Sequence, residues 1–451
     1  MSAALPDQIE IRPVEPFDAR LRPPGSKSLT NRALLLAALA EGTSTLRHLL
    51  LADDTQRMLD ALAALGFHLD RADDAHTARL TGAAGHVPGA DVALDLGNAG
   101  TAMRFLAAAC CLPPAEPVGH TLSTRRLDGI ARMRQRPIGQ LVDALRQLGA
   151  SIDYLEQVGY PPLAVRATGL KGGDANALLL GPTLSSQYIS ALLLVGPYCD
   201  GGLTLRFDGP VTSQPYVRMT IELMRRFGAD VEVDDAFTEV RVASGAYRAL
   251  DYDIEPDASN ANYFLAAAAV VPGSRCTIEG LGTPSLQGDV HFVEVLQRMG
   301  ANVEMSDDTI TVCAASNVLR GIDVSLGAMP DMAQTLAAVA LFAEGPTTIR
   351  DIGNLRVKET DRLAAMQQEL GKLGATVLIH GDSLRIDPPA SGELRPATID
   401  TYDDHRMAMS FAVVGLRAPG VTINDPGCVA KSFPDFFDYL ERLRTTAGAA
   451  E

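Results

Sequence analysis

The stretch LVDALRQLGA, residues 141–150, combines apolar residues at helical spacing with a glycine directly after the last of them. Apolar positions three and four residues apart form one face of an amphipathic helix. Gly149 then suits the left-handed conformation in which many helices end. The same pattern recurs at residues 59–67, 221–229, 293–301 and 366–375, and a weaker sixth copy begins at Phe436. Six copies in 451 residues predict an internal repeat of about 75 residues.

A second series of helices alternates with the first. Their sequences are nearly all apolar after the first turn, and they occupy residues 29–42, 101–112, 185–196, 259–271, 331–345 and 405–416. A helix that is apolar on every side is buried. Strand-like sequence such as DVEVD, residues 230–234, follows three of the amphipathic helices. Each repeat is therefore predicted to pack one buried and one amphipathic helix against short strands, as in an α/β fold.

Composition narrows the class of protein. At roughly 100 to 200 residues per domain, 451 residues predict two or three domains, and an apolar content of 47% is enough to fill their cores. The net charge of -16 argues against a surface that binds nucleic acid through its phosphates. Any anionic ligand must therefore be held by a local group of cations.

Neither membrane insertion nor secretion is indicated. The longest apolar runs, such as residues 33–40, are shorter than the roughly 18 residues that a membrane-spanning helix needs. The opening residues MSAALPDQIEIRP contain neither the basic nor the apolar segment of a signal peptide, so we expect a cytoplasmic protein. The six cysteines lack the spacing of a disulfide framework or a zinc site, which predicts buried thiols and no bound metal.

The buried helices share a second feature, because each begins with polar residues. These residues are Lys27 to Arg32, Asn98 to Thr101, Ser185 to Gln187, Asp257 to Asn260, Asp331, and Asp404 to Arg406. The N-terminus of a helix carries a partial positive charge and unbonded N–H groups, both of which favour anions. If several of these N-termini converge on one cleft, they form a site for anionic ligands.

Four motifs carry most of the charge at these positions, and each has two interpretations. PPGSKSLTNR, residues 23–32, fits either a nest for phosphate oxygens or a capped helix start, and Ser26 before Lys27 excludes a Walker A loop. NLRVKETDR, residues 354–362, fits either a solvated charged face or charges directed from a strand end into a cleft.

The other two motifs centre on arginines. In DDHR, residues 403–406, Arg406 fits either a bidentate clamp on a carboxylate or phosphate, or a structural ion pair with a neighbouring aspartate. In RMRQRPIG, residues 132–139, three arginines fit either a binding element or an exposed basic loop. Neither motif has the histidine or cysteine spacing of a metal site.

Taken together and in this order, these motifs resemble the 5-enolpyruvylshikimate-3-phosphate (EPSP) synthase family over about residues 21–443. The sequences that carry the resemblance are GSKSLTNRALLLAALAEG, LGNAGTAMRFLAAA, RPIGQLVDAL, SSQYISALLL, SQPY, PDMAQTLAAVALF, NLRVKETDRL, DDHRMAMSFAV and KSFPDFF. The family moves the enolpyruvyl group of phosphoenolpyruvate to the 5-hydroxyl of shikimate 3-phosphate and releases phosphate through a tetrahedral intermediate. The resemblance implies no metal or organic cofactor, two small-molecule substrates and a monomer.

The family's fold has two similar domains of three βαβαββ repeats each, an arrangement called an inverted α/β barrel, and its chain crosses between the domains twice. The resemblance therefore implies one domain over residues 22–253 on the shikimate 3-phosphate side. The second domain would comprise residues 1–21 and 254–451 and carry the catalytic carboxylates and the cations for phosphoenolpyruvate. A cleft between the domains would hold both substrates.

The resemblance also implies roles for individual residues. Catalysis would rest on Asp331 as the base on the 5-hydroxyl, Glu359 as the acid that protonates the methylene carbon, and Lys27. Shikimate 3-phosphate would contact Lys27, Ser28, Arg32, Ser185, Ser186, Gln187, Ser213, Tyr216, Asp331, Asn354 and Lys358. Phosphoenolpyruvate would contact Lys27, Asn98, Gly100, Thr101, Arg136, Gln187, Arg362, His405, Arg406 and Lys431.

Two features depart from or refine the family pattern. The stretch 113–130 is longer than the family usually has. Arg132 and Arg134 are therefore weaker matches to the family's arginines than Arg136, whose position is fixed by the following Pro137. Gly100 is the small residue typical of members whose phosphoenolpyruvate site also admits glyphosate, so we expect sensitivity to that inhibitor.

Two rival functions remain at this stage. UDP-N-acetylglucosamine enolpyruvyl transferase shares the repeat architecture, but it usually carries a cysteine shortly before its Arg-Pro-Val element, and IARMRQRPIG, residues 130–139, has none. A non-catalytic repeat scaffold would not explain lysines and arginines gathered at buried helix starts.

Overall fold

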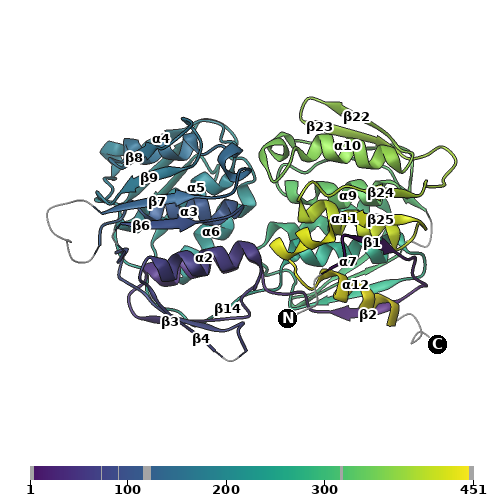
Figure 1. Cartoon of the computed structure of the whole chain (residues 1–451), viewed down its shortest axis with the longest axis horizontal. Coiled ribbons are helices and arrows are strands. Elements are labelled where there is room, and N and C mark those ends of the chain that lie inside the picture. The colour runs from purple at the N-terminus through teal and green to yellow at the C-terminus, as the bar shows by residue number, and fades with distance from the viewer. Residues whose placement is uncertain (1–4, 73, 90, 115–122, 315–317, 446–451) are drawn as a thin grey trace. The chain divides into compact units, whose positions relative to one another are not determined.

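The chain forms two units and passes between them twice (Figure 1). The computed structural model describes residues 5–72, 74–89, 91–114, 123–314 and 318–445, so residues 115–122 of the long 113–130 stretch lie outside the description. One unit, here the central unit, comprises Gly25–Ile254. The other, the terminal unit, comprises Met1–Pro24 and Glu255–Glu451.

As far as its residues are described, the central unit is built on three sheets of four strands. The first has the order β14 (Tyr252–Asp253), β3 (Thr43–Arg47), β5 (Ala78–Thr81) and β4 (His68–Arg71). The second has the order β6 (Val92–Asp95), β7 (Thr124–Asp128), β9 (Leu163–Arg166) and β8 (Ser151–Tyr154). The third has the order β10 (Leu178–Leu180), β11 (Leu203–Phe207), β13 (Glu239–Val242) and β12 (Val231–Val233). In each sheet a parallel pair lies beside two antiparallel pairs. In the second sheet, Val92 of β6 is opposite Arg125 of β7, and Leu127 of β7 is opposite Leu163 of β9.

The described part of the terminal unit repeats the pattern with two differences. Its first sheet has the order β2 (Asp18–Leu21), β15 (Arg275–Glu279), β17 (Thr309–Cys313) and β16 (Asn302–Met305). The second has the order β19 (Asp323–Ser325), β21 (Thr347–Arg350), β23 (Ser383–Asp387) and β22 (Thr376–His380). The third has the order β1 (Gln8–Ile11), β25 (Val421–Asn424) and β24 (Ala397–Ile399). A short pair, β18 (Leu319–Arg320) and β20 (Ala343–Glu344), is separate from these. Within the described residues the third sheet has three strands, whereas the other two have four.

Strands from distant parts of the chain complete three of the sheets. In the central unit β14 pairs in parallel with β3, although about 200 residues separate them. In the terminal unit β2 pairs in parallel with β15, and β1 pairs antiparallel with β25. Each unit therefore closes on itself by returning an end segment to its own first or last sheet, which explains why the chain crosses between units twice.

The two predicted series of helices are present. The buried series is α1 (Lys27–Leu39), α3 (Gly100–Ala109), α5 (Ser186–Val195), α7 (Ala258–Val270), α9 (Ala333–Ala340) and α11 (His405–Gly415). The amphipathic series is α2 (Asp53–Ala64), α4 (Gly139–Gln147), α6 (Gln214–Arg226), α8 (Phe292–Met299), α10 (Arg362–Lys372) and α12 (Phe436–Thr445). All residues of α3, α7, α9 and α11 are buried, which confirms the interpretation of their apolar sequences.

The predicted glycine stops are also confirmed. The residues concerned are Gly66, Gly149, Gly228, Gly300 and Gly374, and all five have φ between 84° and 117°. A side chain is strained in this conformation, so only glycine ends the helix there without cost.

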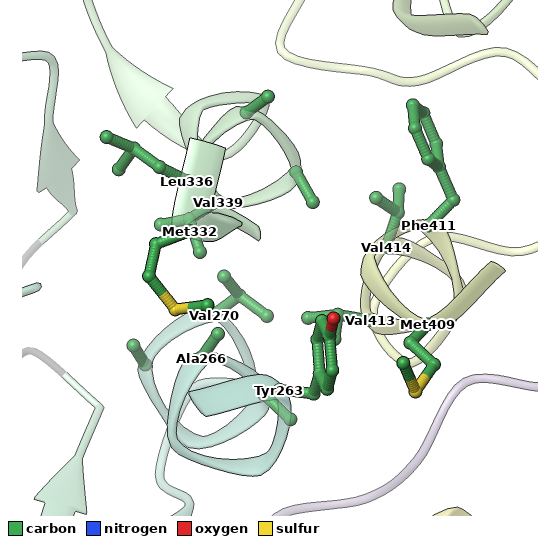
Figure 2. Close-up of a cluster of buried hydrophobic side chains, with 14 of the residues drawn as sticks. Tyr263, Ala266, Val270, Met332, Leu336, Val339, Met409, Phe411, Val413 and Val414 are labelled. Atoms are coloured by element: carbon green, nitrogen blue, oxygen red, sulfur yellow. The ribbon is translucent and has the colours of Figure 1, made fainter. Parts of the chain in front are cut away.

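In the terminal unit the three buried helices share one core. Side chains of α7, α9 and α11, among them Ala266, Val339 and Val413, gather between the three helices (Figure 2). Because such a core is close-packed, the helices cannot shift independently. Their N-termini, which begin at Ala258, Ala333 and His405, are therefore held at fixed positions relative to one another.

Among the described residues, no helix has both the length and the apolar content needed to cross a membrane. Five of the six cysteines are buried thiols, and Cys313 is partly exposed.

Arg125 of β7 is a buried cation that serves the fold of the central unit. Its guanidinium donates to four backbone carbonyls, those of Val87, Gly89, Cys110 and Leu112. The last two lie at the end of α3, where helical carbonyls lack partners within the helix. Arg125 thus ties the end of α3 to the segment before β6, and its side chain is fully buried.

Arg125→Met should lower the free energy of unfolding by about 3–5 kcal/mol, because four buried carbonyls would lose their donor. Arg126→Met is the matched control, since the adjacent Arg126 is half exposed and lies 3.6 Å from Asp128. Thermal unfolding of the two variants measures the difference. Equal losses for both would contradict the role given to Arg125.

Candidate active site

Asp331 is the centre of a cluster of charged side chains in the terminal unit. It lies in the 3-10 turn η5 (Pro330–Met332) that leads into α9. Its Oδ1 accepts a hydrogen bond from Arg362 at 2.9 Å and lies 3.8 Å from Nζ of Lys358, and its Oδ2 accepts from Arg406 at 3.1 Å. These three cations come from three separate segments of the chain, which the fold brings to one carboxylate.

Arg362, the first residue of α10, links three carboxylates. Besides Asp331, its guanidinium donates to Asp404 at 2.7 and 3.2 Å and to Glu359 at 3.1 Å. Asp361 caps the helix by accepting from the N–H groups of Leu363 and Ala364, which fixes where Arg362 stands. The Arg362 side chain is only 1% exposed, so its charge is compensated within the protein.

The start of α11 provides the third side of the cluster. Asp404 caps this helix by accepting from the N–H of Arg406 at 2.9 Å, and His405 Nδ1 lies 3.7 Å from Asp404. Lys431 ends the 3-10 helix η7 (Pro426–Lys431), with its Nζ 4.0 Å from Glu359. His405, Arg406 and Lys431 are all buried.

The charges in this cluster shift one another's pKa values. Burial raises the pKa of the Asp331 carboxyl, but the charges of Arg406, Lys358 and Arg362 lower it by more, so the pKa lies well below its ordinary value. Burial lowers the pKa of Arg362, but Asp404, Glu359 and Asp331 raise it by more. At neutral pH Asp331 is therefore a carboxylate and Arg362 a cation.

The structure shows where the charged side chains of both motifs in this unit lie. In the 354–362 motif, Arg356 and Asp361 form an ion pair near the surface, whereas Glu359 and Arg362 are buried and face the cluster. The guanidinium of Arg406 pairs with Asp331, which is 75 residues earlier in the chain. Asn354 lies on the 3-10 turn η6 (Gly353–Val357), which Lys358 follows.

In the central unit, one group of predicted residues lies at the start of α3. Arg136 donates to the backbone oxygen of Asn98 at 3.0 Å and to its side chain at 3.1 Å. A side chain on Gly100 would collide with this guanidinium, because its Cβ would lie 2.5 Å from Nη2 of Arg136. Gln187, in the first turn of α5, donates to the hydroxyl of Thr101 at 3.3 Å. These five residues therefore form one local group.

A second group surrounds Arg32 of α1. The guanidinium donates to the hydroxyls of Thr220 and Ser190 and to the carbonyls of Ser28 and Tyr216. Within the described part of the chain, all these partners are neutral oxygen atoms. Burial lowers the pKa of Arg32 to about 10, so the side chain stays protonated at neutral pH. A buried cation with neutral partners favours the binding of an anion.

The remaining predicted residues take their places at helix starts. Lys27 opens α1 and pairs with Asp54 at 3.1 Å. Ser185 caps α5 by accepting from the N–H of Gln187, and Ser186 is the first residue of that helix. Ser213 precedes α6 with φ of 51°, and Tyr216 is in its first turn.

Arg134 differs from Arg136 in its partners and its exposure. It forms ion pairs with Asp128 and Glu156, and its side chain is partly exposed.

Sequence reasoning did not assign partners to the buried cations. Asp54, which pairs with Lys27, lies in the first turn of an amphipathic helix. Acidic residues are common there because the helix dipole favours negative charge at that end. Thr220 and Ser190 lie within helices and carry no signal of their own. Asp404 was visible as a charged residue before a buried helix, but its pairing with Arg362, 42 residues earlier, had no sequence signal.

Comparison with known proteins identifies the family. The family model for EPSP synthase (3-phosphoshikimate 1-carboxyvinyltransferase) matches residues 11–440. The 3-phosphoshikimate 1-carboxyvinyltransferase of Serratia proteamaculans is 48% identical over 443 residues, which cover 98% of this chain and 100% of that protein. The chain belongs to the EPSP synthase family. The relative from Vibrio atlanticus is 46% identical over 441 residues and covers 97% of this chain and 99% of its own.

Solved structures support the same assignment. EPSP synthase from Acinetobacter baumannii has a TM-score of 0.77 at 26% identity, over 97% of this chain and 98% of that one. The enolpyruvyl transferase NikO from Streptomyces tendae has a TM-score of 0.71 at 21% identity, over 97% of this chain and 96% of that one. This likeness supports the fold alone. The predicted family, enzyme class and two-domain inverted α/β barrel are confirmed, and UDP-N-acetylglucosamine enolpyruvyl transferase has less support.

No group of three or more His, Cys, Asp or Glu residues suited to hold a metal ion occurs in the described ranges.

Asp404→Asn should lower the free energy of unfolding by about 3–5 kcal/mol, because the buried guanidinium of Arg362 would lose its fully buried carboxylate partner. The matched control is Asp323→Asn in the same unit, which breaks an exposed pair with Arg350 at 2.8 Å and should cost less than about 1 kcal/mol. Thermal unfolding measures both variants. A cost for Asp404→Asn no larger than that of the control would contradict the buried pair's importance.

Proposed function

We propose that the chain transfers the enolpyruvyl group of phosphoenolpyruvate to the 5-hydroxyl of shikimate 3-phosphate and releases phosphate, using the residues described above. The observation that carries the proposal is the Asp331 carboxylate among three cations at the start of a buried helix, beside a second carboxylate, Glu359. The reaction needs this combination, since two polyanions must be held while protons move at two different atoms.

Both units contribute residues to shikimate 3-phosphate in this proposal. In the central unit, the neutral surroundings of Arg32 support a role in binding an anionic group, together with Lys27, Ser28, Ser185, Ser186, Gln187, Ser213 and Tyr216. In the terminal unit, Asn354, Lys358 and Asp331 complete the set. Lys358 is 21% exposed and lies 3.8 Å from Asp331, so it is available to a ligand that approaches this carboxylate.

Phosphoenolpyruvate requires more positive charge in a small volume. In the terminal unit Arg362, Arg406, Lys431 and His405 are the proposed contacts, and in the central unit Asn98, Gly100, Thr101, Arg136, Gln187 and Lys27. Arginine forks bind carboxylate and phosphate oxygens in pairs, and these interactions are strong where water is excluded. The burial of the four cations Arg136, Arg362, Arg406 and Lys431 supports this assignment.

Asp331 acts in this proposal as the base that receives the proton of the 5-hydroxyl. Its lowered pKa makes it a weak base while the three cations surround it alone. The phosphate and carboxylate groups of the substrates compete for the same cations, so binding should raise the pKa of Asp331. The proton transfer then occurs only in the loaded site.

Glu359 acts as the acid toward the methylene carbon. Its carboxylate accepts from Arg362 at 3.1 Å and lies 4.0 Å from Lys431, so it is next to two proposed contacts of phosphoenolpyruvate. In the loaded site a protonated Glu359 gives its proton to the methylene carbon, and the 5-hydroxyl oxygen adds to the cationic carbon as Asp331 takes the hydroxyl proton. The tetrahedral intermediate then loses phosphate and one proton of the new methyl group, which returns to Glu359 and restores the carbon–carbon double bond of the product. Lys27 is proposed to stabilise charge on both substrates.

We further infer that the enzyme acts as a monomer in the cytoplasm on these two small molecules. All residues proposed for substrate binding and catalysis come from one chain, so a second copy is not needed to complete the set.

The direct test is phosphate release from phosphoenolpyruvate, measured with shikimate 3-phosphate and, in parallel, with UDP-N-acetylglucosamine as acceptor. The proposal predicts release with shikimate 3-phosphate only. Release only with the sugar nucleotide would assign the sister reaction, and the absence of release with both, from protein shown to be folded by circular dichroism, would contradict enolpyruvyl transfer.

Asp331→Ala should lower turnover by about 10²–10⁴-fold, the usual contribution of a general base, while binding of shikimate 3-phosphate stays measurable by calorimetry. Asp323→Ala, which removes an exposed carboxylate from the same unit, is the control and should leave turnover unchanged. Near-normal turnover of Asp331→Ala would exclude Asp331 as the base.

Gly100→Ala should raise KM for phosphoenolpyruvate about tenfold and weaken inhibition by glyphosate, because the new Cβ displaces the guanidinium of Arg136. Gly181→Ala in the same unit is the control, since nothing lies within 4 Å of its added Cβ. Steady-state kinetics with and without glyphosate measure both effects. If wild-type turnover persists undiminished at millimolar glyphosate, the predicted sensitivity is wrong.

A further inference from the structure

Glu369 is a fully buried carboxylate that the proposed reaction does not use. It lies on α10 of the terminal unit and accepts hydrogen bonds from the hydroxyl of Tyr402 at 2.6 Å and from the backbone N–H of Asp400 at 3.0 Å. Lys372 lies one turn further along the helix, with its Nζ 2.6 Å from Glu369 and 2.8 Å from Asp400. These contacts occupy both oxygens of the carboxylate, so Glu369 binds the protein's own chain rather than a ligand.

The segment that Glu369 holds has an unfavourable backbone conformation. Tyr402 has φ of 56° and Asp403 has φ of 54°, two consecutive left-handed residues that are not glycine. Each such residue costs roughly 1–2 kcal/mol relative to the right-handed conformation. A strained turn of this kind persists only where its surroundings fix it, and such turns are frequent at functional sites. The turn leads directly into Asp404, the cap of α11.

The same face of α10 holds this turn at two points. Arg362 and Glu369 are seven residues apart, which places them on one face of the helix two turns apart. Glu369 holds Asp400 and Tyr402 at the start of the turn, and Arg362 holds Asp404 at its end. The turn is therefore fixed along its length against one rigid element.

Two further contacts support the start of the turn. Asn424 donates to the side chain of Asp400 at 3.0 Å, and Lys372 donates to the carbonyl of Thr398 at 3.1 Å. Burial and the hydrogen bond to Glu369 raise the pKa of Tyr402, so its hydroxyl keeps its proton at neutral pH. Glu369 thus holds the turn through a donor, Tyr402, that stays protonated at neutral pH.

The end of the turn fixes two cations. Asp404 accepts from the guanidinium of Arg362 and, at 2.9 Å, from the backbone N–H of Arg406. A movement of the turn would displace Asp404 and, with it, the guanidinium of Arg362 and the start of α11. Both arginines are proposed contacts of phosphoenolpyruvate.

We propose that Glu369 and Tyr402 are positioning residues, which hold the 400–404 turn so that Arg362 and Arg406 are placed to bind phosphoenolpyruvate. This role rests on the proposed function, because it names a substrate of that reaction. It predicts a selective effect. Loss of the hydrogen bond between Tyr402 and Glu369, here called the clamp, should weaken the binding of phosphoenolpyruvate more than that of shikimate 3-phosphate, because the proposed contacts of shikimate 3-phosphate are mostly in the central unit.

Tyr402→Phe tests the proposal by removing one hydroxyl from a part of the chain that no substrate is proposed to touch. KM for phosphoenolpyruvate should rise between about 5- and 100-fold, as expected for a misplaced binding group, while KM for shikimate 3-phosphate changes less than about twofold. Tyr247→Phe is the matched control, because it removes a buried tyrosine hydroxyl that donates to the carbonyl of Leu194 in the central unit. The control should lower the unfolding temperature and leave both KM values unchanged.

Glu369→Gln provides the second variant. The glutamine amide can accept from Tyr402, but its NH₂ group would then face two donors, the N–H of Asp400 and the ammonium of Lys372. The same selective rise in KM is expected. If Glu369→Gln does not yield folded protein, the result for Tyr402→Phe decides.

Three outcomes would overturn the positioning role. Tyr402→Phe could lose stability with both KM values unchanged, both KM values could rise equally, or folded Glu369→Gln could bind phosphoenolpyruvate normally. Activity of the wild-type enzyme with both substrates is measured alongside. Its absence would count against the proposed function itself, whereas an active wild type with an unselective Tyr402→Phe variant would count against the clamp alone.

Discussion

The position of one guanidinium, that of Arg362, constrains the whole charged cluster of the terminal unit. The Arg362 side chain is 1% exposed, and three nearby carboxylates compensate its charge: Asp331, Glu359 and Asp404. These carboxylates belong to the starts of α9, α10 and α11 or the turns that lead into them. Compensating one charge therefore requires three segments to meet, and the close-packed core of α7, α9 and α11 holds them there.

In the proposed function, the main contribution of the cluster is to chemistry rather than to stability. Buried ion pairs often add little net stability, because the loss of hydration offsets their attraction, so an apolar core would serve the fold as well. What the charges provide is a set of cations whose positions are fixed before any ligand arrives, with Asp331 kept ionised among them. The central unit differs, since the hydrogen-bond partners of Arg32 within the described residues are neutral oxygen atoms, which supports its proposed role in binding an anionic group. Carboxylates compensate the cations of one unit, while in the other unit the hydrogen-bond partners described for the buried Arg32 are neutral oxygen atoms.

Periodicity accounts for what the sequence could predict. The two helix series, the five glycine stops and the polar starts of the buried helices are local patterns, and the structure has all of them. Long-range pairing has no such signal. The sequence could not show that β14 pairs with β3, that β1 completes a three-stranded sheet, or that Lys27 pairs with Asp54. The motif resemblance supplied the candidate residues, but the link between Glu369 and the strained turn at Tyr402 follows only from the folded arrangement of α10 and α11.

The ionisation of Asp331 is the most direct test of this account, because every proposed role in the terminal unit depends on the cations that surround it. Carbon-13 NMR of protein labelled at the aspartate carboxyl groups, with the Asp331 signal assigned from its absence in Asp331→Asn, gives the pKa in the ligand-free enzyme. We expect this carboxyl to titrate below the ordinary aspartate value of about 3.9, and we expect saturating phosphoenolpyruvate and shikimate 3-phosphate to raise its pKa. A pKa at or above the ordinary value in the ligand-free enzyme would contradict the cluster of cations on which the account rests.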